Sequence, residues 1–472
     1  MTTLRFHGSA AVLLLPLALF VAVTARLFIS EAAFDLTGLA AAGVLTLFSG
    51  SLLAKAPSEY WKAAVRGASS ELTGTVVLIL IASGIFSAMM KASGVADGLV
   101  FLGGMLHLTG HAFTVFVLLA SSLMAAATGS SIGTLLAAMP IFFPAGVALG
   151  ADPTMLAGAV LSGAIFGDNL APVSDVTVIS SVTQRFRNGT PADIAGVVRT
   201  RLPYAMTALA VSMPVYAFMG ASRPVSEAAL SGDASALLML VPVAVLIAVA
   251  VRTRDVLMAI SAGTVTGTAT GLLIGRLSFA TIFAAVDGRL SGFLISGISN
   301  VSPIILLCVT LFAFTGIVRE AGVPDMMAKA LEAGSAGRPS ALRTELFLSA
   351  ATLVVTTLFA AVTSASVALV GSLTDDIGRA SNVHPYRRSH ILSGLANSLP
   401  VLMPFSAFVL ITMAAVSGLE GAAAVTPFTL MTAAFYPIAL FLVFGFMVLT
   451  GTGRMMETPE PEAAEAKTAT AL

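Results

Sequence analysis

Apolar windows of membrane-spanning length recur from one end of this sequence to the other, and they constrain its fold more than any other feature. About 20 consecutive apolar residues in a helix cross the hydrocarbon core of a bilayer. Such windows lie at about residues 10–29, 34–54, 73–92, 154–182, 202–220, 235–252, 255–275, 299–318, 389–413 and 425–450. Only 10% of the 472 residues are charged, against about 25% in soluble domains. The sequence therefore predicts an all-α, multi-pass membrane protein.

Two longer apolar segments, 112–150 and 345–373, do not fit a single crossing. Each is interrupted by small and hydroxyl-bearing residues, Thr128-Gly129-Ser130-Ser131 in the first segment and Thr363-Ser364-Ala365-Ser366 in the second. We expect two re-entrant helical hairpins, each of which returns to the side of the membrane where it began.

The distribution of positive residues supports the hairpins and orients the chain. Lys and Arg gather in cytoplasmic loops, and this bias is consistent along the chain only if both long segments return to their starting side. Counting from a cytoplasmic N-terminus places one cytoplasmic loop at Arg185, Arg187, Arg199 and Arg201. Both termini are then expected in the cytoplasm.

A weak internal similarity relates the two halves of the chain. FSAMMKASGVAD, which begins at Phe86, matches FTGIVREAGVPD, which begins at Phe314, and other matches follow in the same order. The two matched spans are expected to run in opposite directions, and inverted repeats of this kind build secondary transporters. We expect one transporter domain at 1–452, with repeats at about 34–220 and 254–450, and a disordered cytoplasmic tail at 453–472.

The window 154–182 carries polar residues at its centre, in the stretch GAIFGDNLAPVSDVTVIS. Gly167 and Pro172 are expected to break the helix there, and a second break is expected at Asn397 and Pro400. An interrupted backbone is tolerated inside hydrocarbon only beside protein or a wet cavity. The freed carbonyl oxygens suit a cation such as Na⁺, while a new helix N-terminus suits an anion.

Asp168 and Asp175 are the two carboxylates that fall well inside a predicted span. A buried carboxylate in a membrane marks an ion or proton path by default. One carboxylate can hold either H⁺ or Na⁺, so we expect the two cations to compete at Asp168, assisted by Asp175. The alternative is structural, with Asp168 capping a helix and Asp175 satisfying freed amides.

Neutral polar groups could complete an oxygen cage around the ion. The candidates are Asn169, Ser174, Thr128, Gly129, Ser130, Ser131, Thr363, Ser364, Ser366 and Asn397. Small and hydroxylated residues also mediate close helix packing in membranes. Both interpretations stay open for the first hairpin tip, and packing is favoured for the second. No carboxylate accompanies Asn397, so the site is expected to be asymmetric.

Several functional classes find no support. The sequence lacks GxxxxGK[ST], which argues against ATP-driven transport. Lys plus Arg and Asp plus Glu number 24 each, so a nucleic-acid partner is not expected. Neither enzymatic activity nor a cofactor is expected. The expected partners are the lipid bilayer, a transported cation or small molecule, and a second copy in a homodimer.

The broken segment resembles the corresponding segment of a known family, the NhaC family of Na⁺/H⁺ antiporters. The family's segment reads approximately G-x-F-G-D-N-x-S-P-I-S-D-T-T, and the matching residues are Gly167, Asp168, Asn169, Pro172, Ser174, Asp175 and Thr177. TGSSIGT at 128–134 is similar to the family's hairpin motif. The resemblance implies a Na⁺- or H⁺-coupled carrier of the cell (inner) membrane, with cation/proton exchange as the default.

Three hypotheses follow from the residues and the resemblance together. The leading one is an antiporter that moves Na⁺ out in exchange for H⁺ by alternating access. The second is a Na⁺- or H⁺-coupled carrier of a small organic acid or amino acid. A cationic side chain inside the bundle would favour that carrier, and the sequence shows no Lys or Arg in the middle of a predicted span. The third is a channel or scaffold, against which the paired breaks argue.

Overall fold

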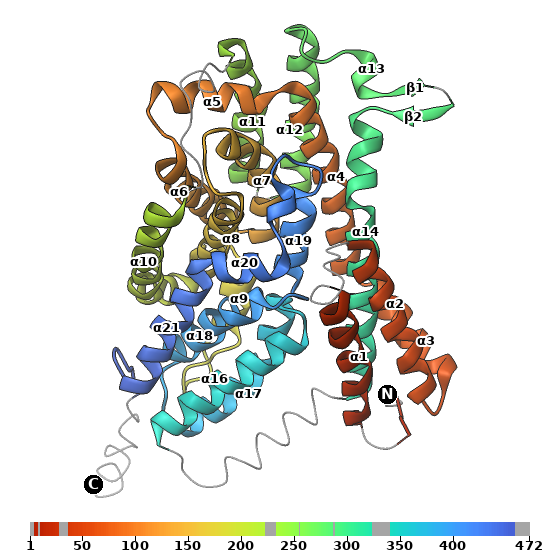
Figure 1. Ribbon diagram of the computed structural model, residues 1–472. Helices are drawn as coiled ribbons and strands as arrows, with labels where there is room; N and C mark the ends of the chain where they lie inside the picture. Colours follow the sequence, from red (N-terminus) through yellow and green to blue (C-terminus); the bar gives the residue numbers. More distant parts are fainter. Residues whose placement is uncertain are drawn as a thin grey trace, which may run out of the picture.

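The computed structural model describes residues 4–7, 10–27, 36–221, 233–253, 255–286, 288–322 and 340–457, and these residues are almost entirely helical (Figure 1). Within these ranges, nine helices are long and apolar enough to cross a membrane, or up to 11 if each strongly bent helix pair counts as one span. The one sheet within the described ranges is an antiparallel hairpin of β1 (Ala284–Val286) and β2 (Arg289–Ser291). The predicted all-α, multi-pass fold class is confirmed.

The first half of the chain contains ten helices within the described ranges. They are α1 (Leu14–Ala25), α2 (Leu36–Leu53), α3 (Pro57–Ala68), α4 (Glu71–Ser93), α5 (Val95–Met105), α6 (Gly110–Thr128), α7 (Ser131–Ala148), α8 (Pro153–Leu170), α9 (Asp175–Val182) and α10 (Ile194–Met219).

The second half repeats much of this order. Its described helices are α11 (Leu240–Thr253), α12 (Val256–Leu273), α13 (Phe279–Ile282), α14 (Phe293–Glu320), α16 (Ala341–Leu358), α17 (Thr363–Ala380), α18 (Pro385–Ala396), α19 (Ala407–Val416), α20 (Pro427–Ala433) and α21 (Phe435–Thr450). Short 3₁₀ helices lie at Ala10–Leu13, Ala234–Met239, Leu399–Leu402 and Ala422–Ala424.

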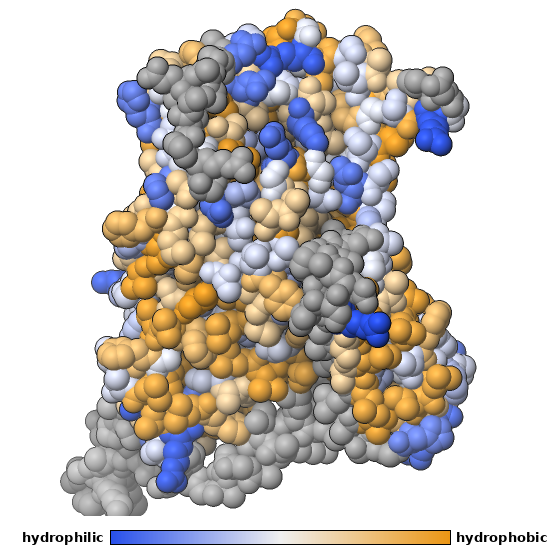
Figure 2. Space-filling view, in the orientation of Figure 1, coloured by the Kyte–Doolittle hydropathy of each residue, from blue (hydrophilic) through white to orange (hydrophobic). Residues whose placement is uncertain are grey.

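The outer surface of the bundle is strongly hydrophobic. Leu52, Phe218 and Leu273 are each more than four-fifths exposed, at 81%, 82% and 87%. Orange, hydrophobic residues cover much of the sides of the molecule, while blue residues gather towards its upper and lower ends (Figure 2). A soluble monomer rarely exposes so much contiguous apolar surface, so we infer that these side chains face lipid.

Helices α4 and α14 are the elements that carry the internal similarity, and they pack side by side in opposite directions (Figure 1). A Cβ atom on Gly84 would lie 2.5 Å from the carbonyl oxygen of Gly297, and one on Gly67, in the last turn of the preceding helix α3, would overlap the backbone near Gly316. Residue numbers rise along one helix as they fall along the other, so the pair is antiparallel. This arrangement supports the inverted repeats that the sequence predicts.

Two helical hairpins form where the sequence predicts them. Helices α6 and α7 join at Gly129, which has a φ of 69°, and α16 and α17 join through residues 359–362. The second turn lies earlier than predicted, because Ala360 and Ala361 make it with φ values of 51° and 58°. Thr363, Ser364 and Ser366 instead form the first turn of α17, where Ser366 Oγ donates to the Val362 carbonyl (2.9 Å). That both hairpins are re-entrant stays a prediction.

Both predicted helix breaks are present, and a third occurs that the sequence analysis did not predict. Residues 171–174 separate α8 from α9, and the chain bends by 52° between Pro385–Leu402 and α19. The third break, at Ala434, bends α20 from α21 by 53° inside the predicted span 425–450. Pro437 follows it and cannot donate to the Ala433 carbonyl, and side chains from other helices stabilise the break, as described with the site below.

The chain beyond α21 is partly ordered, although the sequence predicts a disordered tail from residue 453. Arg454 forms an ion pair with Glu345 (3.0 Å), and the Glu457 N–H donates to the Asn382 carbonyl (2.8 Å). These bonds hold residues 453–457 against the loop before α18. The rest of the predicted tail, 458–472, lies outside the described residues.

The α4–α14 contact gives a first prediction. Gly84→Ala should lower the melting temperature of the purified protein, because the new methyl group meets the α14 backbone and overpacking costs about 1–3 kcal/mol. Gly74→Ala is the matched control, since nothing lies within 4 Å of its Cβ position in the same helix. The control should melt at or slightly above the wild-type temperature. Equal melting of the two variants would contradict this packing.

Candidate functional site

The first hairpin tip and the first helix break are in direct contact. A Cβ on Gly129 would lie 2.5 Å from Val173 Cγ2 and 3.1 Å from the backbone N of Ser174. The left-handed φ of Gly129 also favours glycine. Gly167 has a different role from the one predicted, because it lies inside α8 and a Cβ there would overlap the backbone of Ala125 in α6. It permits close packing of α8 on α6 and does not break the helix.

Asp168 lies in the last turn of α8, beside this contact, and its side chain is buried. Its Oδ1 accepts a hydrogen bond of 2.7 Å from the hydroxyl of Ser174, whereas the buried Oδ2 has no hydrogen-bond partner. The Ser131 hydroxyl lies close to the same carboxyl group. Ser174 is the N-cap of α9 and Ser131 is the first residue of α7. The carboxyl group therefore lies near two helix N-termini, which favour negative charge.

The groups around Asp168 suit a hard cation better than a transition metal. Na⁺ prefers oxygen ligands, which a carboxylate, hydroxyls and backbone carbonyls supply. Among the residues that the structure describes, no three His, Cys, Asp or Glu side chains form a group that could hold a metal ion. The arrangement can thus accept a proton or one small cation on a single carboxylate.

Asp175 lies within the candidate span Pro153–Val182, as the first residue of α9. Its side chain is exposed, unlike that of Asp168. Pro172, in the break itself, is also exposed. The broken backbone turns these two residues outward, a change of direction that an unbroken helix pattern does not reveal. Asp175 is close enough to act electrostatically on Asp168.

Asn169 is buried, and both ends of its amide are engaged. Its Nδ2 donates to Tyr436 Oη (3.2 Å), and its Oδ1 accepts from Ser393 Oγ (3.2 Å). The side chain therefore links α8 to α21 and α18.

The third helix break is held by side chains from α8 and α10. Tyr216 Oη donates to the Ala433 carbonyl (2.7 Å) and accepts from the Phe435 N–H (3.0 Å), while Ser162 Oγ accepts from the Tyr436 N–H (3.2 Å). These contacts satisfy backbone groups that the break leaves without helical partners. Pro437 is the local sign of the break, because it has no N–H to donate to the Ala433 carbonyl and its ring clashes with that carbonyl in a continuous helix.

A buried arginine that the sequence analysis placed in a cytoplasmic loop lies beside the site. Arg201 is 0% exposed, and its helix α10 begins at Ile194, eight residues before the predicted start, so Arg201 lies within a candidate span rather than in a loop. Its Nη1 donates to the Asn169 carbonyl (2.8 Å) and its Nη2 to Ser389 Oγ (3.0 Å). The local sequence around Arg201 does not distinguish it from a neighbouring arginine such as Arg199.

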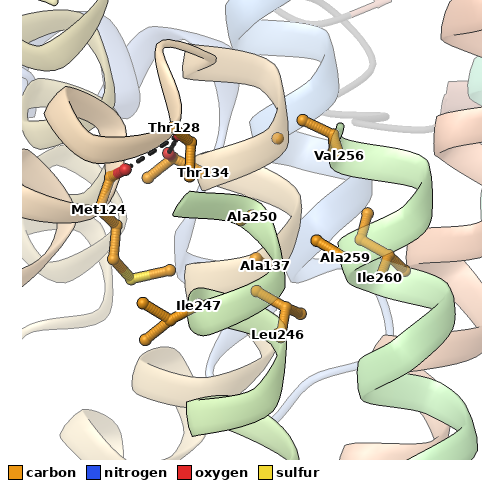
Figure 3. Close-up of a pocket in the computed structure, with 11 residues that line it drawn as sticks. Met124, Thr128, Thr134, Ala137, Leu246, Ile247, Ala250, Val256, Ala259 and Ile260 are labelled. Carbon is orange, nitrogen blue, oxygen red and sulfur yellow. Dashed lines mark hydrogen bonds between the residues drawn. The ribbon is translucent and has the colours of Figure 1, made fainter. Parts of the chain in front are cut away.

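The hydroxyl groups of the first hairpin tip lie in two different environments. Ser130 Oγ caps α7 by accepting from the Gly133 N–H (3.1 Å). Thr128 and Thr134 face a small cavity of about 20 Å³ between the hairpin and helices α11 and α12, where their hydroxyls lie 3.5 Å apart (Figure 3). The other lining residues are Met124, Gly133, Ala137, Leu246, Ile247, Ala250, Val256, Ala259 and Ile260. Because this lining is mostly apolar, the cavity does not suit a bare cation.

The second half provides no carboxylate at its break, as the sequence predicts. Asn397 is fully buried and neither amide atom has a hydrogen-bond partner, and Pro400 is buried in the adjoining 3₁₀ turn. The second hairpin tip contacts its own break, where the Ala407 N–H donates to the Ala360 carbonyl (2.8 Å). Within the described part of the chain, no hydrogen bond joins Thr363, Ser364 or Ser366 to Asp168.

Comparison with known proteins gives the following relatives. The chain is 33% identical to the malate-2H(+)/Na(+)-lactate antiporter of Bacillus subtilis over 34% of this chain and 32% of that protein. It is 28% identical to the Na(+)/H(+) antiporter NhaC of Alkalihalophilus pseudofirmus over 54% of this chain and 58% of that protein. The matched part thus spans less than two thirds of either relative.

Two solved transporter structures are distantly similar. The YdaH transporter of Alcanivorax borkumensis has 12% identity and a TM-score of 0.38, with 81% of this chain and 86% of that chain covered. MtrF of Neisseria gonorrhoeae, described with a class of antimetabolite efflux pumps, has 12% identity and a TM-score of 0.39, with 92% and 95% covered.

A family profile covers the part of the chain that contains the first hairpin, the first break and Asp168. The profile of the Na⁺/H⁺ antiporter family matches residues 3–221. This agrees with the family that the GDN…SD segment resembles. Residues 3–221 of this chain, somewhat less than half of it, are therefore similar to the Na⁺/H⁺ antiporter family.

Proposed function

We propose that this protein is a Na⁺/H⁺ antiporter of the cell membrane in which Na⁺ and H⁺ compete for Asp168. One observation carries the proposal: among the described residues, Asp168 is the one buried carboxylate that forms no ion pair. The other two buried carboxylates, Glu345 and Asp375, are paired with Arg387 (3.0 Å) and Arg388 (2.6 Å). Their charge is already compensated, so they are not available to a transported ion.

The free oxygen of Asp168 explains how two cations can exclude each other. An ionised carboxylate in an apolar interior is costly and gains a proton or a cation instead. Only Oδ2 lacks a partner, while Oδ1 accepts from Ser174. A proton on Oδ2 removes the charge that Na⁺ needs, and bound Na⁺ occupies the oxygen that the proton needs. Exclusive binding is sufficient to couple two opposing flows.

The position of the site between the two halves supports alternating access. Asn169 and Arg201 belong to the first half, and both bind Ser393 on α18 of the second half, at 3.2 and 2.8 Å. In transporters built from inverted repeats, one half rocks against the other around a central site. Rocking would expose Asp168 to one side and then the other. Asp175, exposed beside the site, would attract cations towards it.

Exchange of organic acids is the second candidate function. One observation favours it: the amide of Asn397 is buried without partners. The B. subtilis relative is named as an antiporter of malate and lactate together with H⁺ and Na⁺. In that case a substrate carboxylate would enter the same site with its coupling cations.

Asp168→Asn should abolish Na⁺-driven proton movement, because the amide cannot exchange a proton or neutralise Na⁺. The measurement is the fluorescence of a pH dye in proteoliposomes after Na⁺ is added. Asp175→Asn is the control, and it should keep the maximal rate while needing a higher Na⁺ concentration, since Asp175 is exposed. Full activity in Asp168→Asn would remove the basis of the proposal.

The exchange should be one Na⁺ for one H⁺ and should carry no net charge. Either cation adds one positive charge to the same carboxylate, so the loaded carrier crosses with equal charge in both directions. The test imposes a potassium diffusion potential on vesicles that have no gradient of Na⁺ or H⁺. We expect no Na⁺ accumulation, and accumulation driven by the potential would show that a second charge moves.

Adding organic acids to the same vesicles distinguishes the two candidate functions. We expect Na⁺ to drive proton movement without any organic acid present. Proton movement that begins only when malate or lactate is added would reject simple cation exchange and support the second candidate.

A further inference from the structure

Arg201 differs from the other fully buried arginines of the chain in what it binds. Arg387 and Arg388 each contact a carboxylate, at 3.0 and 2.6 Å. Arg201 is equally buried, and within the described residues no carboxylate lies within ion-pair distance of it. A guanidinium stays protonated in proteins, so Arg201 is a permanent positive charge that no direct ion pair balances.

The guanidinium is held by neutral oxygens from both halves of the chain. In the first half, Nη1 donates to the Asn169 carbonyl (2.8 Å) and Thr177 Oγ1 (3.3 Å), and Nη2 donates to Ser180 Oγ (3.3 Å). In the second half, Nη1 donates to Ser393 Oγ (2.8 Å) and Nη2 to Ser389 Oγ (3.0 Å). The terminal nitrogens are thus fully engaged and present no free fork to a substrate carboxylate.

The charge of Arg201 lies close to the proposed cation site, because Arg201 binds the backbone of the residue next to Asp168. Asn169, whose carbonyl Arg201 binds, directly follows Asp168, and Thr177 also donates to the Asp168 carbonyl (3.3 Å). Asp168 is the carboxylate with which Arg201 interacts electrostatically. Two charges interact much more strongly in an apolar interior than they do at the same distance in water.

We propose that Arg201 sets the affinity of the Asp168 site, since its fixed charge repels a bound Na⁺ and so allows the ion to leave. The inference rests on the proposed function, in which Asp168 binds the cation. Arg201 is a positioning residue under this proposal, because it touches the backbone beside Asp168 and not the transported ion. Removing its charge should tighten Na⁺ binding, whereas removing a merely structural contact should weaken it.

The first test compares Na⁺ binding to the full chain by isothermal titration calorimetry at alkaline pH. Arg201→Gln removes the charge and keeps some hydrogen bonds, and we expect its dissociation constant for Na⁺ to fall about tenfold, or 1.4 kcal/mol. Arg201→Lys keeps the charge and should bind Na⁺ with nearly the wild-type constant. Unchanged or weaker binding by a folded Arg201→Gln variant would overturn the proposal.

A second pair of variants tests the charge without removing the arginine, in case Arg201→Gln does not fold. Ser389→Asp places a carboxylate next to Nη2 and neutralises Arg201 in position, so Na⁺ should again bind more tightly, with one ion per chain. Ser389→Asn has nearly the same shape and no charge, and its affinity should stay near that of the wild type. Equal affinities in this pair would contradict the proposal.

The role of Asp168 is tested separately in the same titrations. Asp168→Asn should show no Na⁺ binding. Binding that persists in this variant would refute the proposed function, because the cation would then sit elsewhere. An affinity that depends on Asp168 but not on the charge of Arg201 would refute only the present inference.

Discussion

The structure depends on side chains that take over the hydrogen bonds of interrupted helices. In hydrocarbon, an unpartnered backbone group costs several kcal/mol, so each break must be satisfied by a neighbouring element. Arg201 and Thr177 bind the carbonyls at the end of α8, and Tyr216 with Ser162 binds the groups freed at Ala434. Because these side chains come from other helices, the breaks also tie the bundle together around Asp168.

The buried charges of the chain divide into two kinds. Glu345 with Arg387, and Asp375 with Arg388, form direct ion pairs that join α16, α17 and α18. Breaking such a pair leaves one charge uncompensated and costs about 3–5 kcal/mol, so these residues stabilise the fold. Asp168 and Arg201 are kept apart by neutral groups. That separation leaves the carboxylate open to an exchangeable cation.

The sequence predicted features that depend on local composition or pattern. The apolar windows predicted the spans, and GDNLAPVSD predicted the first break and the importance of Asp168. Pro437 is a local sign of the break at Ala434 that the analysis did not use. The partners of that break in α8 and α10, and the outward direction of Asp175, depend on the fold and could not be predicted. Arg201 was missed for the same reason. Its burial follows from where α10 begins and from serines on α18, which are distant in the sequence.

The measurement that most directly tests the central claim is the number of protons released when the purified protein binds Na⁺, followed across a range of pH in weak buffer. Competition for one carboxylate predicts that release approaches one proton per Na⁺ at the acidic end and falls towards zero at the alkaline end, while Na⁺ affinity rises. Na⁺ binding without proton release at every pH would show that the two cations occupy separate sites, and would contradict this account.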